Sequence, residues 1–588
     1  MRWTFNSLDP ELSSQLSTEA ALPPLIAQLL VARGVRTAGE AHAFLHPEIA
    51  QLHSPYLMRG MKAVVERVQR AIANEERMLI YGDYDVDGTV AIVILKTAIE
   101  LCGGQADFHV PHRIRDGYGM KDDVIEQAAA AGVRVIISVD TGIRAFAAAE
   151  TAARVGVDLI VTDHHLTEAG NIPQALAVLN PNQPGCDYPC KELCGAGVAF
   201  KVAQALLEAT DRARLLPSFL KMVAIATVSD AVSLTGENRV ITRLGLDGLR
   251  HPVNPGLKAL LEVAALSGRR LSAGDIGFRI GPRLNAAGRM DVAADVIELF
   301  TTKDATRAGE IALKLDRLNS GRQQEEARVL ETIQALMDED AARREPYCLV
   351  LHGDGWHRGV IGIVATRIVE RYGRPALVVS CDPETGEGHG SGRSIAAFHL
   401  LDALEDESCR HLFTRFGGHA HAVGFALPSA NLAQLASALD TYARAHLLPS
   451  DFEPLIEIDS EIEMDEIDER LFQTLQQLAP FGLGNREPVF AARNAKLLQP
   501  PRIMKEKHLK LRIRDGNGEG RCFDTLGWRM AERLKLDPLV VGQSLDLAFT
   551  IEDSSNQDFP GLQLVLRDYR QTALEPVAAS AVASQLAT

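Results

Sequence analysis

The sequence has few cysteines for its length and no long apolar run. Eight cysteines are scattered over 588 residues, unlike the dense cysteine framework of a small secreted domain. No window of about 20 apolar residues is present, and residues 1–6 lack the apolar core of a signal peptide. These absences predict a cytoplasmic protein without a membrane-spanning segment.

Three of the cysteines are evenly spaced. Cys186, Cys190 and Cys194 follow one another at intervals of four residues. A structural zinc site prefers C-x2-C pairs and needs a fourth ligand. Ordinary reduced thiols are therefore the favoured interpretation, and a metal site is the alternative.

Positively charged residues are fewer than negatively charged ones. The chain has 61 Lys and Arg against 77 Asp and Glu, a net charge of −16. This balance argues against a protein that coats nucleic acid non-specifically. It leaves room for an enzyme that binds phosphates in a local basic channel, because acids that hold metal ions are neutralised.

The remaining composition is that of a multidomain globular protein. Apolar residues make up 46% and charged residues 23% of the chain, and the length suits about three or four domains. We predict an N-terminal helical segment, an α/β domain with a parallel sheet, a long connector helix, a second α/β domain, a β domain and a flexible tail. Their predicted limits are 1–50, 51–304, 305–343, 344–450, 455–570 and 571–588.

Local patterns support this division. Strands alternate with helices from about residue 60 to 230, which is typical of a doubly wound sheet. Residues 305–343 are dense in Ala, Glu, Arg and Leu and almost free of Gly and Pro, which predicts a helix. Residues 386–392 carry a glycine at every second position and are predicted to form a loop.

Carboxylates and histidines follow apolar runs of the first α/β domain. Short β-branched runs predict buried parallel strands, and ligands bind at the carboxyl ends of such strands. The shared site predicted at these ends contains Asp83, Asp85, Asp87, Asp140, Asp163, His164 and His165, with Asp230 after a further apolar stretch at 216–228.

The D-x-D-x-D-G segment that starts at Asp83 also invites comparison with a calcium-binding EF-hand loop. That loop needs a bidentate Glu at its twelfth position. The twelfth position here is Ile94, and the segment follows a predicted strand rather than a helix. The calcium loop is therefore excluded.

A pair of divalent ions fits the acids better. Two ions about 4 Å apart need a bridging carboxylate and further ligands on each side. Asp85 and Asp87 alternate along the loop and can serve different ions, Asp140 is the natural bridge, and His164 with Asp230 can complete the second ion. Mixed carboxylate and imidazole ligands suit Mn²⁺, and Mg²⁺ is also possible.

The triplet at 163–165, together with the acidic loop, resembles the DHH phosphoesterase superfamily. Four further segments are similar to the RecJ exonucleases of that superfamily: LCGAGVAF at 193–200, PRLNAAGR at 282–289, SGRS at 391–394 and GGHAH at 417–421. The last two lie where the family carries its DHHA1 domain. The resemblance covers roughly residues 50–570.

The resemblance implies a role for each residue of the site. Two metal ions would be held by Asp85, Asp87, Asp140, His164 and Asp230, with Asp83 either a further ligand or a residue that orients the loop. Asp163 would hold an imidazole in place, and His165 would contact the scissile phosphate. The pyrophosphatase-like branch has a histidine at the position where Tyr81 stands in this chain.

Substrate contacts are expected on the second α/β domain. The glycine-rich segment with Ser391 and Arg393 is either a plain turn or a phosphate cradle, and the resemblance assigns it to the 5′-terminal phosphate of DNA. Arg113 would add a guanidinium. His419 is interpreted as a substrate contact rather than half of an H-x-H metal pair. Asn285 and Arg289, in the first domain, either contact phosphate or buttress the fold.

The β domain contains one strictly alternating segment at 508–514. Its apolar residues predict one buried face, and Lys510 and Arg512 fall on the other. A solvated edge strand would explain this pattern, but an OB-fold that tracks single-stranded nucleic acid fits it better.

Three functions are compatible with these observations. The favoured one is a metal-dependent exonuclease that digests single-stranded DNA from the 5′ end to 5′-mononucleotides. A phosphoesterase of small substrates and an inactive DNA-bound scaffold are the alternatives. The resemblance further implies a monomer that acts in DNA repair and recombination, with a single-strand binding protein and a helicase as partners.

Overall fold

The structure is a computed structural model of the chain, and it divides into two compact units. One unit comprises Met1–His46, Pro454–Ala479 and Arg486–Thr588, and the other Pro47–Glu453 and Pro480–Asn485. The predicted flexible tail lies outside the described residues from position 573 onward. The residues that the structure describes are 1–7, 9–113, 115–117, 119–168, 170–516, 520–554 and 561–572.

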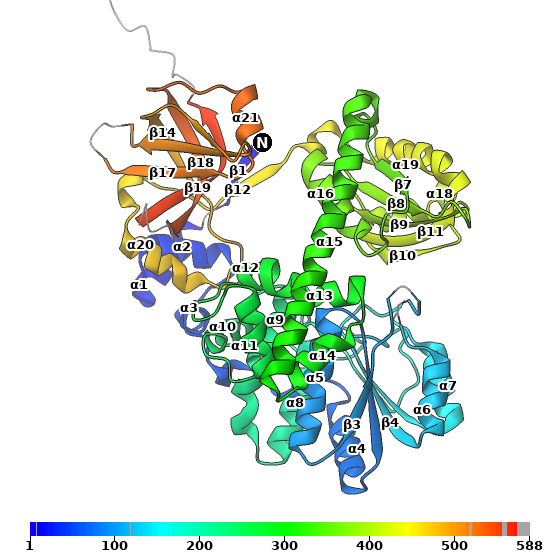
Figure 1. Ribbon diagram of the computed structural model, residues 1–588. Coiled ribbons are helices and arrows are strands. Elements are labelled where there is room, and N and C mark those ends of the chain that lie inside the picture. Colours follow the sequence, from blue (N-terminus) through cyan, green and yellow to red (C-terminus); the bar gives the residue numbers. More distant parts are fainter. Residues whose placement is uncertain are drawn as a thin grey trace, which may run out of the picture. The chain divides into compact units, whose positions relative to one another are not determined.

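The unit that contains Pro47–Glu453 begins with a five-stranded sheet in which every pairing is parallel (Figure 1). Its strand order is β3-β2-β4-β5-β6. The strands are β2 (Arg77–Gly82), β3 (Ala106–His109), β4 (Val133–Val139), β5 (Asp158–Thr162) and β6 (Ala177–Leu179). The predicted parallel sheet is thus confirmed, and its strand ends fall beside the predicted acids.

Helices cover both faces of this sheet, because successive side chains of a strand point to opposite faces. On β4, Val135 and Ile137 pack in one apolar cluster and Ile136 packs in another. The first cluster receives side chains from α4 (Met61–Ala73), α5 (Val86–Leu101) and α8 (Gly195–Ala209), and the second from α6 (Asp122–Ala130) and α7 (Phe146–Val155).

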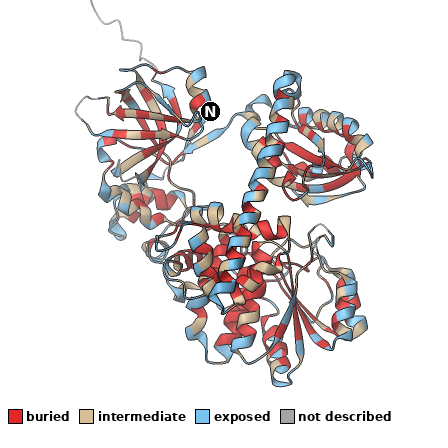
Figure 2. Ribbon diagram, viewed as in Figure 1, coloured by how far each residue is buried: buried red, intermediate tan, exposed pale blue. Residues whose placement is uncertain are grey.

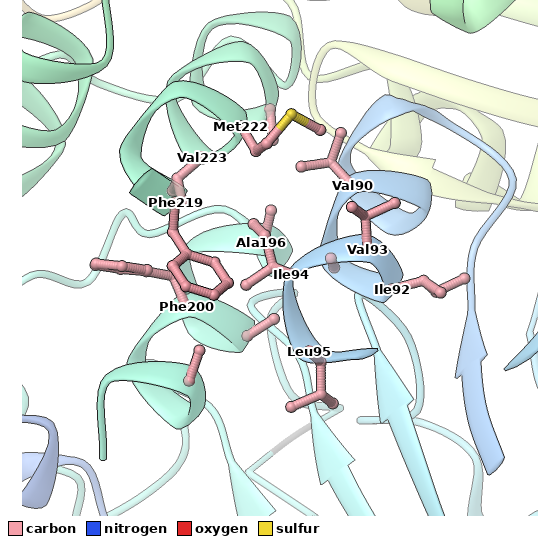
Figure 3. Close-up of a cluster of buried hydrophobic side chains, with 14 of the residues drawn as sticks. Val90, Ile92, Val93, Ile94, Leu95, Ala196, Phe200, Phe219, Met222 and Val223 are labelled. Carbon is pink, nitrogen blue, oxygen red and sulfur yellow. The ribbon is translucent and has the colours of Figure 1, made fainter. Parts of the chain in front are cut away.

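Further helices extend the first of these clusters. The apolar stretch before Asp230 is a helix, α9 (Leu216–Ser229), and Figure 3 shows its side chains gathered with those of α5 and α8. The helices that follow are α10 (Gly236–Gly248), α11 (Pro255–Val263), α12 (Ala273–Asp275), the π-helix η4 (Ile276–Ile280), α13 (Gly281–Met290) and α14 (Ala294–Thr301).

The predicted connector helix is α15, a single helix of 35 residues from Ala305 to Glu339. Its two halves belong to different apolar cores. Ile311 and Leu315 pack in the core of the first α/β domain, whereas Val329 and Ile333 pack in that of the second. Buried positions accordingly appear along both halves of the helix in Figure 2.

The second α/β domain has a five-stranded sheet of order β10-β11-β9-β8-β7, in which only β7 and β8 pair in parallel. Its strands are β7 (Leu349–Asp354), β8 (Ala376–Cys381), β9 (Glu387–Arg393), β10 (Arg415–His419) and β11 (Ala422–Pro428). Its helices are α16 (Ile361–Tyr372), α17 (Leu400–Glu405), α18 (Glu407–Arg410) and α19 (Leu432–His446).

The prediction of a glycine-rich loop at 386–392 was wrong, because most of this segment is strand β9. β9 pairs with β8 on one side and β11 on the other. A Cβ atom at Gly390 would lie 2.0 Å from Cζ of Phe425, and one at Gly392 would lie 2.7 Å from Cγ2 of Val423. The alternating glycines therefore make room for side chains of the neighbouring strand, and both strand edges are paired with neighbours.

The unit that contains Met1–His46 and most of the chain after Pro454 contains a β-barrel. The sheet order is β13-β14-β18-β19-β17-β16-β15, and a further pairing of β14 with β16 closes the barrel, as in an OB-fold. β16 (His508–Arg514) is paired on both sides, so the edge-strand interpretation of this segment was wrong. The strands are β13 (Ser460–Glu461), β14 (Phe490–Leu497), β15 (Arg502–Met504), β17 (Cys522–Gly527), β18 (Ser544–Ser554) and β19 (Gly561–Gln571).

The N-terminal residues to His46 belong to the same unit as the barrel. Besides the expected helices, they form a strand that the sequence did not predict, β1 (Arg2–Phe5), which pairs in parallel with β12 (Leu455–Ile458). Trp3 anchors it by donating from Nε1 to Asp568 Oδ2 at 2.8 Å. The helices are α1 (Pro10–Glu19), α2 (Pro24–Ala32) and α3 (Ala38–Leu45).

The exact limits of the domains stay a prediction. Within the described part of the chain, no helix is both long enough and apolar enough to cross a membrane.

Candidate metal centre and substrate site

The acidic loop connects the end of β2 to the start of α5. Asp85 is the N-cap of α5, and its Oδ1 accepts the Gly88 N–H at 3.0 Å. A Cβ atom at Gly88 would lie 2.6 Å from the Asp83 carbonyl oxygen, so glycine permits the tight turn. Asn285 Oδ1 accepts the Val86 N–H at 3.2 Å. The loop is thus fixed by its own Asp85 side chain and by Asn285 of α13. This contact is the buttressing role that the sequence analysis gave as one of two interpretations of Asn285.

Asp140 follows directly on β4 and has a strained backbone. Its φ of 58° lies in the left-handed region, which costs a non-glycine residue about 1–3 kcal/mol. Its N–H donates to the Thr162 carbonyl oxygen at 3.0 Å. Strain held by neighbouring structure is common at functional sites, and here it orients the carboxylate that the sequence predicts as the metal bridge.

The N-terminus of α8 contacts two of the acids. The N–H groups of Gly195 and Ala196 donate to the Asp87 carboxylate at 2.5 and 2.8 Å. A Cβ atom at Gly195 would lie 2.5 Å from Cβ of Asp140. The free N–H groups and dipole of a helix N-terminus favour a carboxylate. This contact orients Asp87, and the close approach to Asp140 explains the glycine at position 195. The sequence alone did not reveal the role of that glycine.

The two histidines differ in their partners. His164 Nε2 lies 3.2 Å from Asp140 Oδ1 and 3.8 Å from both Asp87 Oδ2 and Asp230 Oδ2. His165 Nδ1 instead lies 2.7 Å from Asp163 Oδ1. Asp163 is itself held by the Ile143 N–H at 2.9 Å. His164 therefore faces the candidate metal-binding acids, and the carboxylate of Asp163 holds the imidazole of His165.

Potential metal ligands converge in three groups, in each of which the ligand atoms lie within 4.8 Å of one another. Asp140 and His164 each occur in two of them. The Tyr81 hydroxyl donates to the Gly119 carbonyl oxygen at 3.3 Å. The groups are Asp83–Asp85–Asp140, Asp87–His164–Asp230 and Asp140–His164–His165.

The crowding of these acids disfavours their charged forms. Burial, followed by the neighbouring Asp85, raises the pKa of Asp83 to about 8. Burial and the other carboxylates raise the pKa of Asp140 and of Asp230 well above the usual value. Burial lowers the pKa of His164. Neutral imidazole beside carboxylates that lack counter-charges is a donor set that fits divalent cations.

Metal binding is therefore expected to release protons. The carboxyls that hold protons in the metal-free protein must lose them to coordinate, so the apparent affinity for Mn²⁺ should rise between pH 6 and pH 8. Calorimetric titration of Mn²⁺ at pH 7 in two buffers of different ionisation enthalpy measures the release. The Asp83→Asn variant should release fewer protons, and heats that do not depend on the buffer would contradict the assignment.

A basic cavity of about 320 Å³ adjoins the acidic loop. Arg113 lies over the ring of Tyr84, with its Cζ 5.0 Å from the ring centroid, and Arg393 donates to Ser391 Oγ at 3.1 Å. Four predicted substrate residues line the cavity: Arg113, Arg289, Ser391 and Arg393. Two of these residues, Ser391 and Arg393, are side chains of β9. The backbone of β9 is paired with strands on both sides, so it does not form the loop cradle considered above.

Further basic residues of this cavity were missed by the sequence analysis. They are Arg115, Arg358, His389 and Arg415. Arg358 lies between the end of β7 and the start of α16, so the rule that ligands bind at the carboxyl ends of strands could have found it. The charge is concentrated enough to perturb its members: burial and the neighbouring arginines lower the pKa of Arg289 to about 10. An anionic ligand would relieve this repulsion.

The remaining predicted contacts lie in other places. His419 lines a cavity of about 650 Å³ together with His165. Arg289 donates to the Gly359 carbonyl oxygen at 2.9 Å and so links α13 to the second α/β domain. In the barrel, Lys510 and Arg512 both pair with Asp524, at 3.0 and 2.8 Å. Their side chains line a separate cavity of about 350 Å³.

Of the three evenly spaced cysteines, Cys194 lies beside the acids, and burial together with the neighbouring Asp87 raises the pKa of its thiol. Cys186, Cys190 and Cys194 are free thiols, and within the described ranges no cluster of potential metal ligands includes them. Cys194 is the residue that caps α8. The interpretation as ordinary thiols agrees with these contacts.

Comparison with known proteins identifies the class to which this fold and site belong. Residues 77–227 match the family model described as "DHH family, N-terminal domain", residues 345–445 match "DHHA1 domain", and residues 458–568 match "RecJ OB domain". The fold is thus that of a DHH phosphoesterase.

Relatives identify the family within that class. The chain is 35% identical to the single-stranded-DNA-specific exonuclease RecJ of Bacillus subtilis, covering 97% of this chain and 70% of the relative. It is 33% identical to RecJ of Escherichia coli, covering 95% of this chain and 97% of that relative. The crystal structure of Thermus thermophilus RecJ in complex with Mn²⁺ matches this chain with a TM-score of 0.82 at 26% identity. The match covers 97% of this chain and 80% of the Thermus thermophilus chain. The chain belongs to the RecJ family of exonucleases, and it is therefore a hydrolase.

Proposed function

We propose that the chain is a metal-dependent exonuclease that digests single-stranded DNA from its 5′ end and releases 5′-mononucleotides. One observation carries the proposal: a cluster of potential metal ligands adjoins a cavity lined by arginines. The ligand cluster suits phosphodiester hydrolysis. The cavity suits a terminal phosphate, because planar guanidinium groups bind phosphate oxygens in pairs.

Two divalent ions, Mn²⁺ or Mg²⁺, are the proposed cofactors. Crystal structures of Thermus thermophilus RecJ contain Mn²⁺ or Mg²⁺, and the acids and His164 described above would hold such ions in this chain. When bound, the ions supply an activated water and neutralise charge on the phosphate. The proposed ligands are Asp83, Asp85 and Asp140 for one ion and Asp87, His164 and Asp230 for the other, with Asp140 bridging.

The chain's own residues then bind and orient the substrate. The side chains of Arg113, Ser391 and Arg393 would hold the 5′-terminal phosphate. Burial lowers the pKa of His165, but its hydrogen bond to Asp163 outweighs that effect and raises it. His165 is therefore suited to donate a hydrogen bond to the scissile phosphate.

Other parts of the proposal follow from family membership. Lys510 and Arg512 would exchange their shared partner Asp524 for backbone phosphates of the strand. We also propose a monomer that acts in the cytoplasm in DNA repair and recombination, with a single-strand binding protein and a helicase as partners.

The test is digestion of one strand labelled at either end, with and without a 5′-phosphate. Early release of a 5′-labelled mononucleotide from single-stranded and not from duplex DNA is expected. Replacing Arg393 by Gln should raise KM about 10- to 100-fold for the 5′-phosphorylated strand and much less for the strand with a 5′-hydroxyl. Digestion from the 3′ end would refute the proposed polarity, and a preference for dinucleotides would favour a phosphoesterase of small substrates.

A further inference from the structure

A second cavity, of about 140 Å³, lies beside the candidate metal centre, and its lining includes Ser229 and Arg322, to which the proposed reaction assigns no role. Its lining includes Ser229, Asn285 and Arg289 of the first α/β domain and Arg322 of the connector helix. Ser229 directly precedes the potential metal ligand Asp230, and Arg289 also lines the basic cavity described above. The cavity is thus a neighbour of both the metal centre and the proposed 5′-phosphate site.

The cavity contains polar atoms without partners. Arg322 is only 8% exposed, and its Nε has no hydrogen-bond partner. The Ser229 hydroxyl also lacks a partner. A Cβ atom at Gly281 would lie 2.7 Å from that hydroxyl, so the glycine leaves space beside it. A buried donor without a partner costs about 1–3 kcal/mol, and a ligand that accepts from both groups would recover this cost.

The charge of the cavity indicates what such a ligand is. Arg322 pairs with Glu326 at 2.9 Å, but Glu326 also pairs with Arg367 at 3.3 Å. Arg367 is also paired with Glu370 at 2.9 Å, so these two guanidinium groups are matched by two carboxylates, and Arg289 adds a further positive charge. The excess positive charge favours an anion with several acceptor oxygens, such as a phosphodiester.

An exposed aromatic ring directly follows one of the lining residues in the sequence. The π-helix η4 contains Gly277, which lines the cavity, and next to it Phe278, whose side chain is 82% exposed. π-helical turns are often found at functional sites. A large apolar ring in water is unfavourable, whereas a base stacked on an aromatic ring gains about 1–3 kcal/mol.

We propose that this cavity and Phe278 form a subsite for the nucleotide on the 3′ side of the scissile bond, with the phosphate that follows this nucleotide at Arg322 and Ser229 and the base of the nucleotide on Phe278. The inference rests on the proposed function. If the basic cavity holds the 5′-terminal phosphate, the rest of the strand must leave the metal centre elsewhere. The second cavity shares Arg289 with the first and supplies a route of suitable charge.

The test uses the full-length protein and 5′-phosphorylated oligo(dT) of two to twelve nucleotides. Binding is measured by fluorescence anisotropy of 3′-labelled strands in EDTA, and digestion is measured in Mn²⁺. Phe278→Ala should weaken binding of the twelve-mer about ten-fold. Arg322→Lys, which keeps the charge but lacks Nε, should raise KM for strands longer than two nucleotides. The effect of Arg322→Lys should be smaller on the dinucleotide, which lacks the phosphate that follows the second nucleotide.

Matched controls are available in the same unit of the chain. Val253→Ala removes another side chain that is mostly exposed, and Arg317→Gln removes an exposed arginine of α15. Both should leave the length dependence of the parent unchanged. Binding of the twelve-mer by Phe278→Ala at parental affinity would overturn the proposal. Failure of the proposed function itself would be visible in the parent, which would then digest no strand from its 5′ end.

Discussion

An Asp140→Asn variant is expected to lose digestion of single-stranded DNA by a factor on the order of 10³ or more in kcat. Asp140 belongs to the ligand group of one proposed ion and lies 3.2 Å from His164, a proposed ligand of the other, so the substitution is expected to weaken both proposed ion sites at once. Asn tolerates the left-handed backbone at this position almost as well as Asp, so the change removes charge without forcing the chain to move. Single-turnover digestion at several Mn²⁺ concentrations measures the loss.

The same variant should be more stable than the parent when no metal is present. An acid whose pKa is raised in the folded protein contributes stability at low pH and loses it as the pH rises towards the folded pKa. The amide that replaces the Asp140 carboxyl does not ionise and has no such loss. The difference in Tm in EDTA should therefore favour the variant and widen from pH 6 to pH 8. Mn²⁺ should raise the Tm of the parent more than that of the variant.

Asp107→Asn is the matched control, because Asp107 is an exposed acid on the edge strand β3. It should keep the parent's activity and metal response. Digestion by Asp140→Asn at the parental rate and Mn²⁺ requirement would show that the metal centre is assigned to the wrong residues.

The acids of the site could be predicted because they follow strands whose pattern is unmistakable. The β-branched runs before Asp83, Asp140 and Asp163 identify buried parallel strands, and the carboxyl ends of such strands meet at one edge of the sheet. The sequence could not show what holds these acids. The N-terminus of α8 reaches Asp87 across more than one hundred positions of the chain, and nothing local to either segment indicates that contact.

The glycines of the second α/β domain show a different limit. A glycine at every second position between 386 and 392 has the composition of a loop and the period of a strand. The strand is decided by Phe425 and Val423, whose side chains fill the space that the glycines leave. Likewise, Arg322 has the sequence context of a solvated helix, but it is buried and lines a cavity with Ser229 and Asn285, which are distant from it in the sequence.

A Gly195→Ala variant is the second substitution with a large expected effect. The new Cβ atom would lie 2.5 Å from Cβ and 2.6 Å from Oδ1 of Asp140, so either the strained Asp140 or the start of α8 must move. Either movement disturbs a proposed ligand, since α8 also donates to Asp87. A displacement of about 1 Å of a reacting group can cost about 10²-fold in rate. We therefore expect kcat to fall on that order and the Mn²⁺ concentration for half-maximal rate to rise.

The rise in Mn²⁺ requirement separates a positioning role from a general loss of packing, which would lower Tm without changing the metal response. Gly197→Ala is the matched control on the same helix, because the three atoms nearest its Cβ all belong to the Leu193 side chain, at 3.2 Å or more. This control should keep the parental Mn²⁺ dependence. If Gly195→Ala also kept it, the N-terminus of α8 would not be what positions Asp87 and Asp140, and their orientation would have to come from the strand ends alone.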